Sequence, residues 1–137
     1  MTVVLLDAGP LLAYLGAGEE LHGWARSQLE GVTSPMITCE AVWVEAAYLI
    51  RERGGNPDEL WKFLRRGMVQ FAFDLETEFE SVAALMRRYA DVPMDLADAC
   101  LVRMSELHRD CRVLTTDSDF RFYRRFGRQV VPLICPV

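Results

Sequence analysis

Short apolar runs alternate with amphipathic segments along the chain. The runs predict strands, and apolar residues at helical spacing predict the helices between them. Alternating strands and helices are typical of a parallel sheet with helices on both faces. The 137 residues are expected to form one domain, residues 1–137, an α/β fold of three α/β/α layers around about five short parallel strands. The predicted strands are Thr2–Leu6, Met36–Thr38, Val69–Phe73, Arg112–Thr115 and Gln129–Ile134.

Helices are predicted wherever the apolar spacing changes to 3.6 residues. Pro10 favours a first turn and a helix that begins at about Leu11. Thr38 is a candidate N-cap for the third helix, which the pair Gly54-Gly55 ends. The predicted helices are Leu11–Gly16, Glu19–Leu29, Cys39–Arg53, Asn56–Arg66, Glu76–Tyr89, Asp95–His108 and Asp119–Arg125.

Four acidic residues stand in apolar surroundings, where a charge is costly. Asp7 and Asp117 each follow a predicted strand, whereas Glu45 and Asp98 interrupt apolar helical segments. In parallel sheets, ligands bind beyond the carboxyl ends of the strands, so the four carboxylates can converge there. A group of buried carboxylates without cations among them calls for a divalent metal. Oxygen ligands without histidine or cysteine favour Mg²⁺ or Mn²⁺ over zinc.

Each acidic residue also has an ordinary structural interpretation. Asp7 could cap the following helix, and Glu45 could face solvent. Asp98 could be a first-turn acid that the helix dipole favours, and Asp117 and Asp119 could be turn residues. That all four interpretations hold together is less expected than that any single one does.

Composition narrows the class of protein. The formal net charge of -5 argues against a broad nucleic-acid-binding surface, although 14 of the 15 basic residues are arginines, which suit phosphate. The four cysteines lack metal-site spacing and are interpreted as reduced, mostly buried thiols. The sequence shows neither a secretory leader pattern nor an apolar run of roughly 20 residues, so we expect a cytoplasmic protein without membrane association.

Four sequence segments together resemble the PIN domain. They are the strand that ends in Asp7, the helix Ala41–Ala47 around Glu45, the helix start Met94–Ala99, and the strand and turn Leu114–Phe120. The resemblance spans the whole chain. Within the PIN family, the sequence is similar to the small ribonuclease toxins of the VapC type. The segment Thr-x-Asp-x-Asp-Phe and the Asp-Ala helix start are its most specific parts.

The resemblance implies a PIN-like fold and metal-dependent hydrolysis of RNA phosphodiester bonds. Carried over by position, the acids that hold Mg²⁺ or Mn²⁺ would be Asp7, Glu45, Asp98 and Asp117. Asp95 and Asp119 match less uniform acidic positions, and Thr115 matches a hydroxyl position, so all three are accessory candidates. The resemblance also implies an RNA substrate, a cognate antitoxin that masks the site, and a homodimer.

Two other functions stay open at the level of the sequence. One is a PIN-fold protein of RNA processing or RNA binding without a toxin role. The other is a phosphotransfer or phosphatase domain, which also places an aspartate after its first strand. Against the latter, Asp7-Ala8-Gly9 lacks a second acid two residues on, and Lys62, the single lysine, does not follow a late strand.

Overall fold

A five-stranded parallel sheet forms the centre of the computed structural model, which describes residues 2–136. The strand order is β3–β2–β1–β4–β7, and all four neighbouring pairs are parallel. β1 occupies the middle because it is apolar on both faces: Leu5 and Leu6 are completely buried. The predicted parallel sheet is therefore confirmed. Its strands are β1 (Val3–Leu6), β2 (Met36–Thr38), β3 (Val69–Phe71), β4 (Cys111–Leu114) and β7 (Leu133–Ile134).

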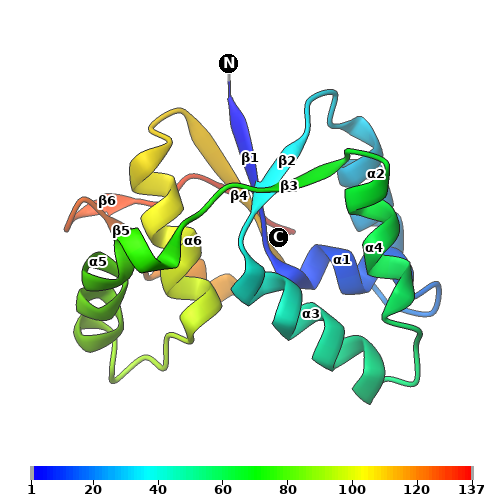
Figure 1. The fold of residues 1–137 in the computed structure, drawn as a ribbon, viewed down its shortest axis with the longest axis horizontal. Helices are drawn as coiled ribbons and strands as arrows, with labels where there is room; N and C mark the ends of the chain where they lie inside the picture. Colours follow the sequence, from blue (N-terminus) through cyan, green and yellow to red (C-terminus); the bar gives the residue numbers. More distant parts are fainter. Residues whose placement is uncertain (1, 137) are drawn as a thin grey trace.

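Helices flank the sheet on both sides (Figure 1). In that view α5 and α6 lie on one side of the strands, and α2 and α4 lie on the other. α6 packs against β1, β4, α3 and α5, and eight of its twelve residues are buried, which explains its continuous apolar sequence. The helices are α1 (Ala8–Leu15), α2 (His22–Gly31), α3 (Glu40–Glu52), α4 (Asp58–Arg65), α5 (Leu75–Arg88) and α6 (Leu96–Leu107).

Capping contacts explain where α1 and α3 differ from the sequence prediction. α1 begins at Ala8, three residues earlier than expected, because the carboxylate of Asp7 accepts a hydrogen bond from the Ala8 amide at 2.7 Å. α3 has Cys39 as its N-cap, without a side-chain cap bond. The predicted cap at Thr38 is wrong, since its hydroxyl donates instead to the Leu6 carbonyl at 2.7 Å and ties β2 to β1.

The chain after Asp117 differs most from the prediction. The expected helix 119–125 is a 3₁₀ turn, η1 (Ser118–Arg121), followed by a hairpin of β5 (Arg124–Arg125) and β6 (Gln129–Val130). Its tip needs two residues of positive φ, Phe126 at 52° and Gly127 at 81°. The expected final strand is split, because β6 pairs with β5 while β7 pairs with β4.

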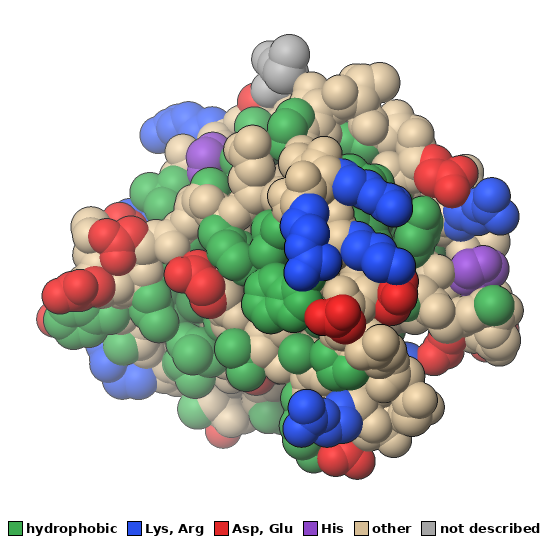
Figure 2. Space-filling model, turned by 45° about the vertical axis from the view of Figure 1, so that its right-hand side comes forward, with side chains coloured by type: hydrophobic (Ala, Val, Ile, Leu, Met, Phe, Trp, Pro, Cys, Tyr) green, Lys and Arg blue, Asp and Glu red, His purple; other side chains and the backbone are tan. Residues whose placement is uncertain are grey.

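The face that α2 and α4 cover carries basic side chains next to hydrophobic ones (Figure 2). α4 contributes Lys62 and Arg65, with Arg66 directly after it, and Trp61 is 44% exposed. Among residues 2–136, no helix combines the length and apolar character that crossing a membrane requires.

Candidate metal-binding active site

The four predicted acids come from elements that meet near the carboxyl end of β1. Asp7 follows β1 and Asp117 follows β4, and these strands are neighbours, with Leu6 in register with Leu114. The Asp7 amide donates to the Leu114 carbonyl at 3.0 Å, which extends the pairing to the first acid. α3 and α6, which carry the other two acids, pack against each other (Figure 1).

Asp7 is buried and held by two donors. Its side chain is 5% exposed; one oxygen accepts from the Ala8 amide, and the other accepts from the Thr115 hydroxyl at 2.6 Å. Burial raises the pKa of Asp7 to about 6, against the lowering effect of these hydrogen bonds, and the charge of Asp117 raises it further. Thr115 also accepts from the Asp117 amide at 2.9 Å, so this hydroxyl joins the two strand-end acids.

Asp98 lies in the first turn of α6 and is 7% exposed. Burial raises its pKa to about 8, and the charges of Asp95 and Asp7 contribute in the same direction. One of its oxygens accepts from the Tyr123 hydroxyl at 3.0 Å. Tyr123 was missed in the sequence, since no spacing connects it with Asp98; its completely buried hydroxyl fixes that carboxylate.

The accessory candidates have separate roles in the structure. Asp95 is exposed and caps α6, accepting from the Asp98 amide at 2.8 Å, so it orients the chain that carries Asp98. Asp119 is half-buried, and its amide donates to Asp117 at 2.9 Å. The turn interpretation of Asp117 and the cap interpretation of Asp7 therefore both hold, and neither excludes a second role for the remaining lone pairs.

Glu45 completes the group from the second turn of α3. It is half-buried, and burial raises its pKa to about 7, followed by the charges of Asp95, Asp7 and Asp117. The neighbouring charges that act most strongly on Asp7, Glu45 and Asp98 are thus those of other carboxylates. The acids share one negative field.

A divalent cation fits this field. As the side chains stand, no three acidic, histidine or cysteine side chains among residues 2–136 are grouped closely enough to hold an ion. Mutual repulsion keeps carboxylates apart when no cation lies between them. The donors are hard oxygens, two of the acids are almost fully buried, and burial, together with the charges of the neighbouring carboxylates, favours their protonated state. Binding of Mg²⁺ or Mn²⁺ would offset the repulsion between these carboxylates and the cost of burying their charges.

Position 9 next to the site is occupied by a glycine for steric reasons, which the sequence analysis did not predict. A Cβ at this position would lie 1.9 Å from the Thr116 hydroxyl oxygen. The first turn of α1 and the turn before Asp117 therefore approach so closely that any larger residue at position 9 would force the Thr116 side chain to move. A glycine two residues after the strand-end aspartate was the available signal.

Comparison with known proteins agrees with this fold. The PIN domain family model matches residues 4–125. Ribonuclease VapC26 of Mycobacterium tuberculosis is 28% identical over 116 residues, which are 83% of this chain and 86% of that protein. A crystal structure of VapC20 from Mycobacterium tuberculosis, described as a toxin that cleaves the sarcin-ricin loop, matches with a TM-score of 0.71 at 20% identity. The match covers 85% of this chain and 91% of that one.

Proposed function

Because the chain belongs to the PIN domain family, we propose that it is a metal-dependent endoribonuclease, the toxin of a type II toxin–antitoxin pair. The observation that carries the proposal is the electrostatic coupling of Asp7, Glu45, Asp98 and Asp117 near the carboxyl end of the central strand. The likeness to VapC26 and VapC20, which are named as a ribonuclease and a toxin, supports the substrate class.

The same four acids would hold Mg²⁺ or Mn²⁺. When bound, the cation supplies the positive charge that a phosphodiester and an attacking water both require. The residues of the chain position the carboxylates. Thr115 and the Ala8 amide fix the two oxygens of Asp7, and Tyr123 fixes one oxygen of Asp98. Fixed donors of this kind keep the carboxylates in place without reorganisation during reaction.

Substitution of single acids tests the proposal. Asp7→Asn and Asp98→Asn each keep the side-chain shape but remove one ligand charge, so each should abolish cleavage of RNA in Mg²⁺ or Mn²⁺. Asp58→Asn removes an equal charge from the exposed first turn of α4 and should cleave like the wild type. Far-UV circular dichroism on the same samples reports the fold. Wild-type turnover in either site variant would refute the assignment.

The partners are part of the proposal. We expect a cognate antitoxin that covers the acidic site and a homodimer of this chain, as the toxin family implies. Co-expression with the small neighbouring reading frame should yield a stable complex that does not cleave RNA. The alternative, a PIN-fold protein of RNA processing, predicts an active nuclease that forms no complex and does not arrest growth when expressed alone.

A further inference from the structure

The positive charge of the C-terminal part of the chain is concentrated in one segment that begins shortly after Asp117. Residues 121–130, here the arginine segment, contain Arg121, Arg124, Arg125 and Arg128, and the chain carries no acidic residue after Asp119. This local excess contrasts with the formal net charge of -5 for the protein. The local positive charge would attract a polyanion to this segment.

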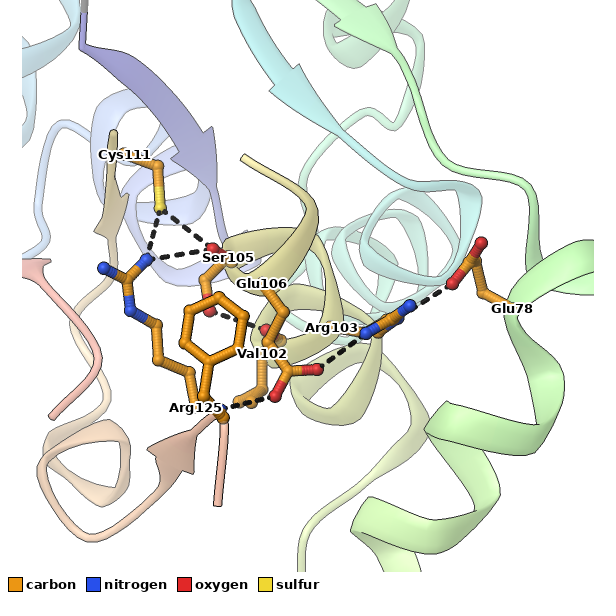
Figure 3. Close-up of polar contacts among 8 residues, drawn as sticks. Glu78, Val102, Arg103, Ser105, Glu106, Cys111 and Arg125 are labelled. Carbon is orange, nitrogen blue, oxygen red and sulfur yellow. Dashed lines mark hydrogen bonds and ion pairs between the residues drawn. The ribbon is translucent and has the colours of Figure 1, made fainter. Parts of the chain in front are cut away.

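The inner side of the arginine segment is fixed to the body of the protein (Figure 3). The Phe126 amide donates to Glu106 at 2.7 Å, and Glu106 pairs with Arg103 at 3.0 Å. The guanidinium of Arg125 donates to the Ser105 carbonyl at 2.9 Å. Arg125 is thereby occupied by structure, and the hairpin is held in one orientation against α6.

The outer side of the segment exposes one aromatic ring and two arginines. Phe122 is 66% exposed, whereas Phe126 is 39% exposed and lies against the guanidinium groups of Arg109 and Arg125. Arg121 and Arg128 are also exposed, and their guanidinium groups make no hydrogen bond or ion pair within residues 2–136. Phe126 holds a positive φ, a conformation that a bulky residue rarely adopts, so the tip is held in an unusual shape. An exposed aromatic ring next to exposed arginines matches what unpaired bases and phosphates require.

The segment is also continuous with the acidic site. Tyr123, which binds Asp98, lies between Phe122 and Arg124 in the chain, and the Phe122 amide donates to the Asp119 carbonyl at 2.9 Å. The hairpin tip, in contrast, is bound to Glu106 in the last turn of α6, whereas Asp98 lies in the first turn of that helix. A nucleic acid strand whose phosphate sits at the acids would therefore meet Arg121 and Phe122 first and would have to run along α6 to reach Arg128. The carboxylates themselves repel such a strand, so a nearby basic surface is needed to hold it.

We propose that the arginine segment is the RNA-docking surface of this protein, with Arg121 and Arg128 contacting phosphates and Phe122 stacking on an unpaired base. This inference rests on the proposed ribonuclease function. The other basic surface, on α4, is less suitable because Lys62 already pairs with Glu59 at 3.0 Å and the helix begins with two acids.

Binding of RNA to the full chain tests the inference. The probe is a fluorescein-labelled RNA stem-loop of mixed sequence, and fluorescence anisotropy is measured in EDTA over a range of salt concentrations. Arg121→Ala/Arg128→Ala should raise Kd about tenfold and reduce the log–log salt slope by about 1.4, two single-strand phosphate contacts. Phe122→Ala should raise Kd roughly fivefold to a hundredfold.

Matched variants separate the possible outcomes. Arg65→Ala/Arg66→Ala removes the same charge from the α4 face, and Phe79→Ala removes a ring that is 55% exposed on α5; both should change Kd less than about twofold. Equal Kd and salt slope for wild type and Arg121→Ala/Arg128→Ala would overturn the inference. A double variant with an altered sedimentation mass but unchanged RNA binding would also overturn it, because the segment would then be a contact between protein subunits. A wild type that neither binds nor cleaves RNA would refute the proposed function itself.

Discussion

Replacing Glu45 with Gln should stabilise the metal-free protein, and the gain should grow with pH. The pKa of Glu45 rises from 4.5 to about 7 on folding, mainly through burial. Between these two pH values the folded chain keeps a proton that the unfolded chain has released. The unfolding free energy of the wild type therefore falls as pH rises through this window. Gln carries no titrating proton, so its variant escapes this loss.

The magnitude follows from the same pKa values. At 1.36 kcal/mol per pKa unit, the full cost of the charge reaches ~3 kcal/mol at about pH 8. Because Glu45 is only half-buried, solvent screening reduces this to about 1–2 kcal/mol. For a chain of this length that corresponds to a melting temperature higher by about 3–8 °C. At about pH 5 most of the difference should disappear.

Thermal melts in EDTA at several pH values measure this gap. Glu52→Gln on the exposed end of the same helix is the control and should change stability by less than about 0.5 kcal/mol. A gap that is equal at low and high pH would mean that the substitution acts through packing rather than charge. A variant less stable than the wild type at about pH 8 would refute the reasoning, because Glu45 would then be favourably paired.

Three further predictions concern the same site. Gly9→Ala should lower both stability and RNA cleavage, because the added Cβ would displace the Thr116 side chain. The control Gly23→Ala, which has open space around it in α2, should instead raise the unfolding free energy by roughly 0.5–1 kcal/mol, and thermal melts compare the two variants. Thr115→Val should cost about 1–3 kcal/mol and reduce cleavage by removing the hydroxyl between two acids, and Thr115→Ser should restore both. Mn²⁺ at about a hundredfold excess over Kd should stabilise the wild type by roughly 2.7 kcal/mol and Asp98→Asn much less; equal responses would exclude Asp98 as a ligand.

The sequence predicted the parallel sheet because its signals are local. Apolar runs such as Val3–Leu6 reveal the strands, and a charge at the end of such a run reveals Asp7. The pattern of acids in apolar segments suggested that Glu45 and Asp98 approach the strand ends, but their placement depends on how two helices pack, which the sequence does not encode locally.

Other features depend on contacts that no spacing encodes. Tyr123 reaches Asp98 across 25 positions of sequence. The β5–β6 hairpin requires a positive φ at Phe126, a conformation that non-glycine residues rarely adopt. The local sequence therefore favours a helix over a hairpin for this arginine-rich segment. Tertiary bonds such as that from the Phe126 amide to Glu106 decide the outcome there.

The order of strands in the sheet also sets the moment at which the enzyme can become active during its synthesis. β1 leaves the ribosome first, yet its partner β4 begins at Cys111 and the last proposed ligand is Asp117. At roughly 5–20 residues per second, the N-terminal half waits several seconds for the strand that completes the acidic site. Until Asp117 is made, a nascent chain carries at most three of the four proposed ligands. The ribosome that makes this nuclease would be exposed to it only after translation of nearly the whole chain.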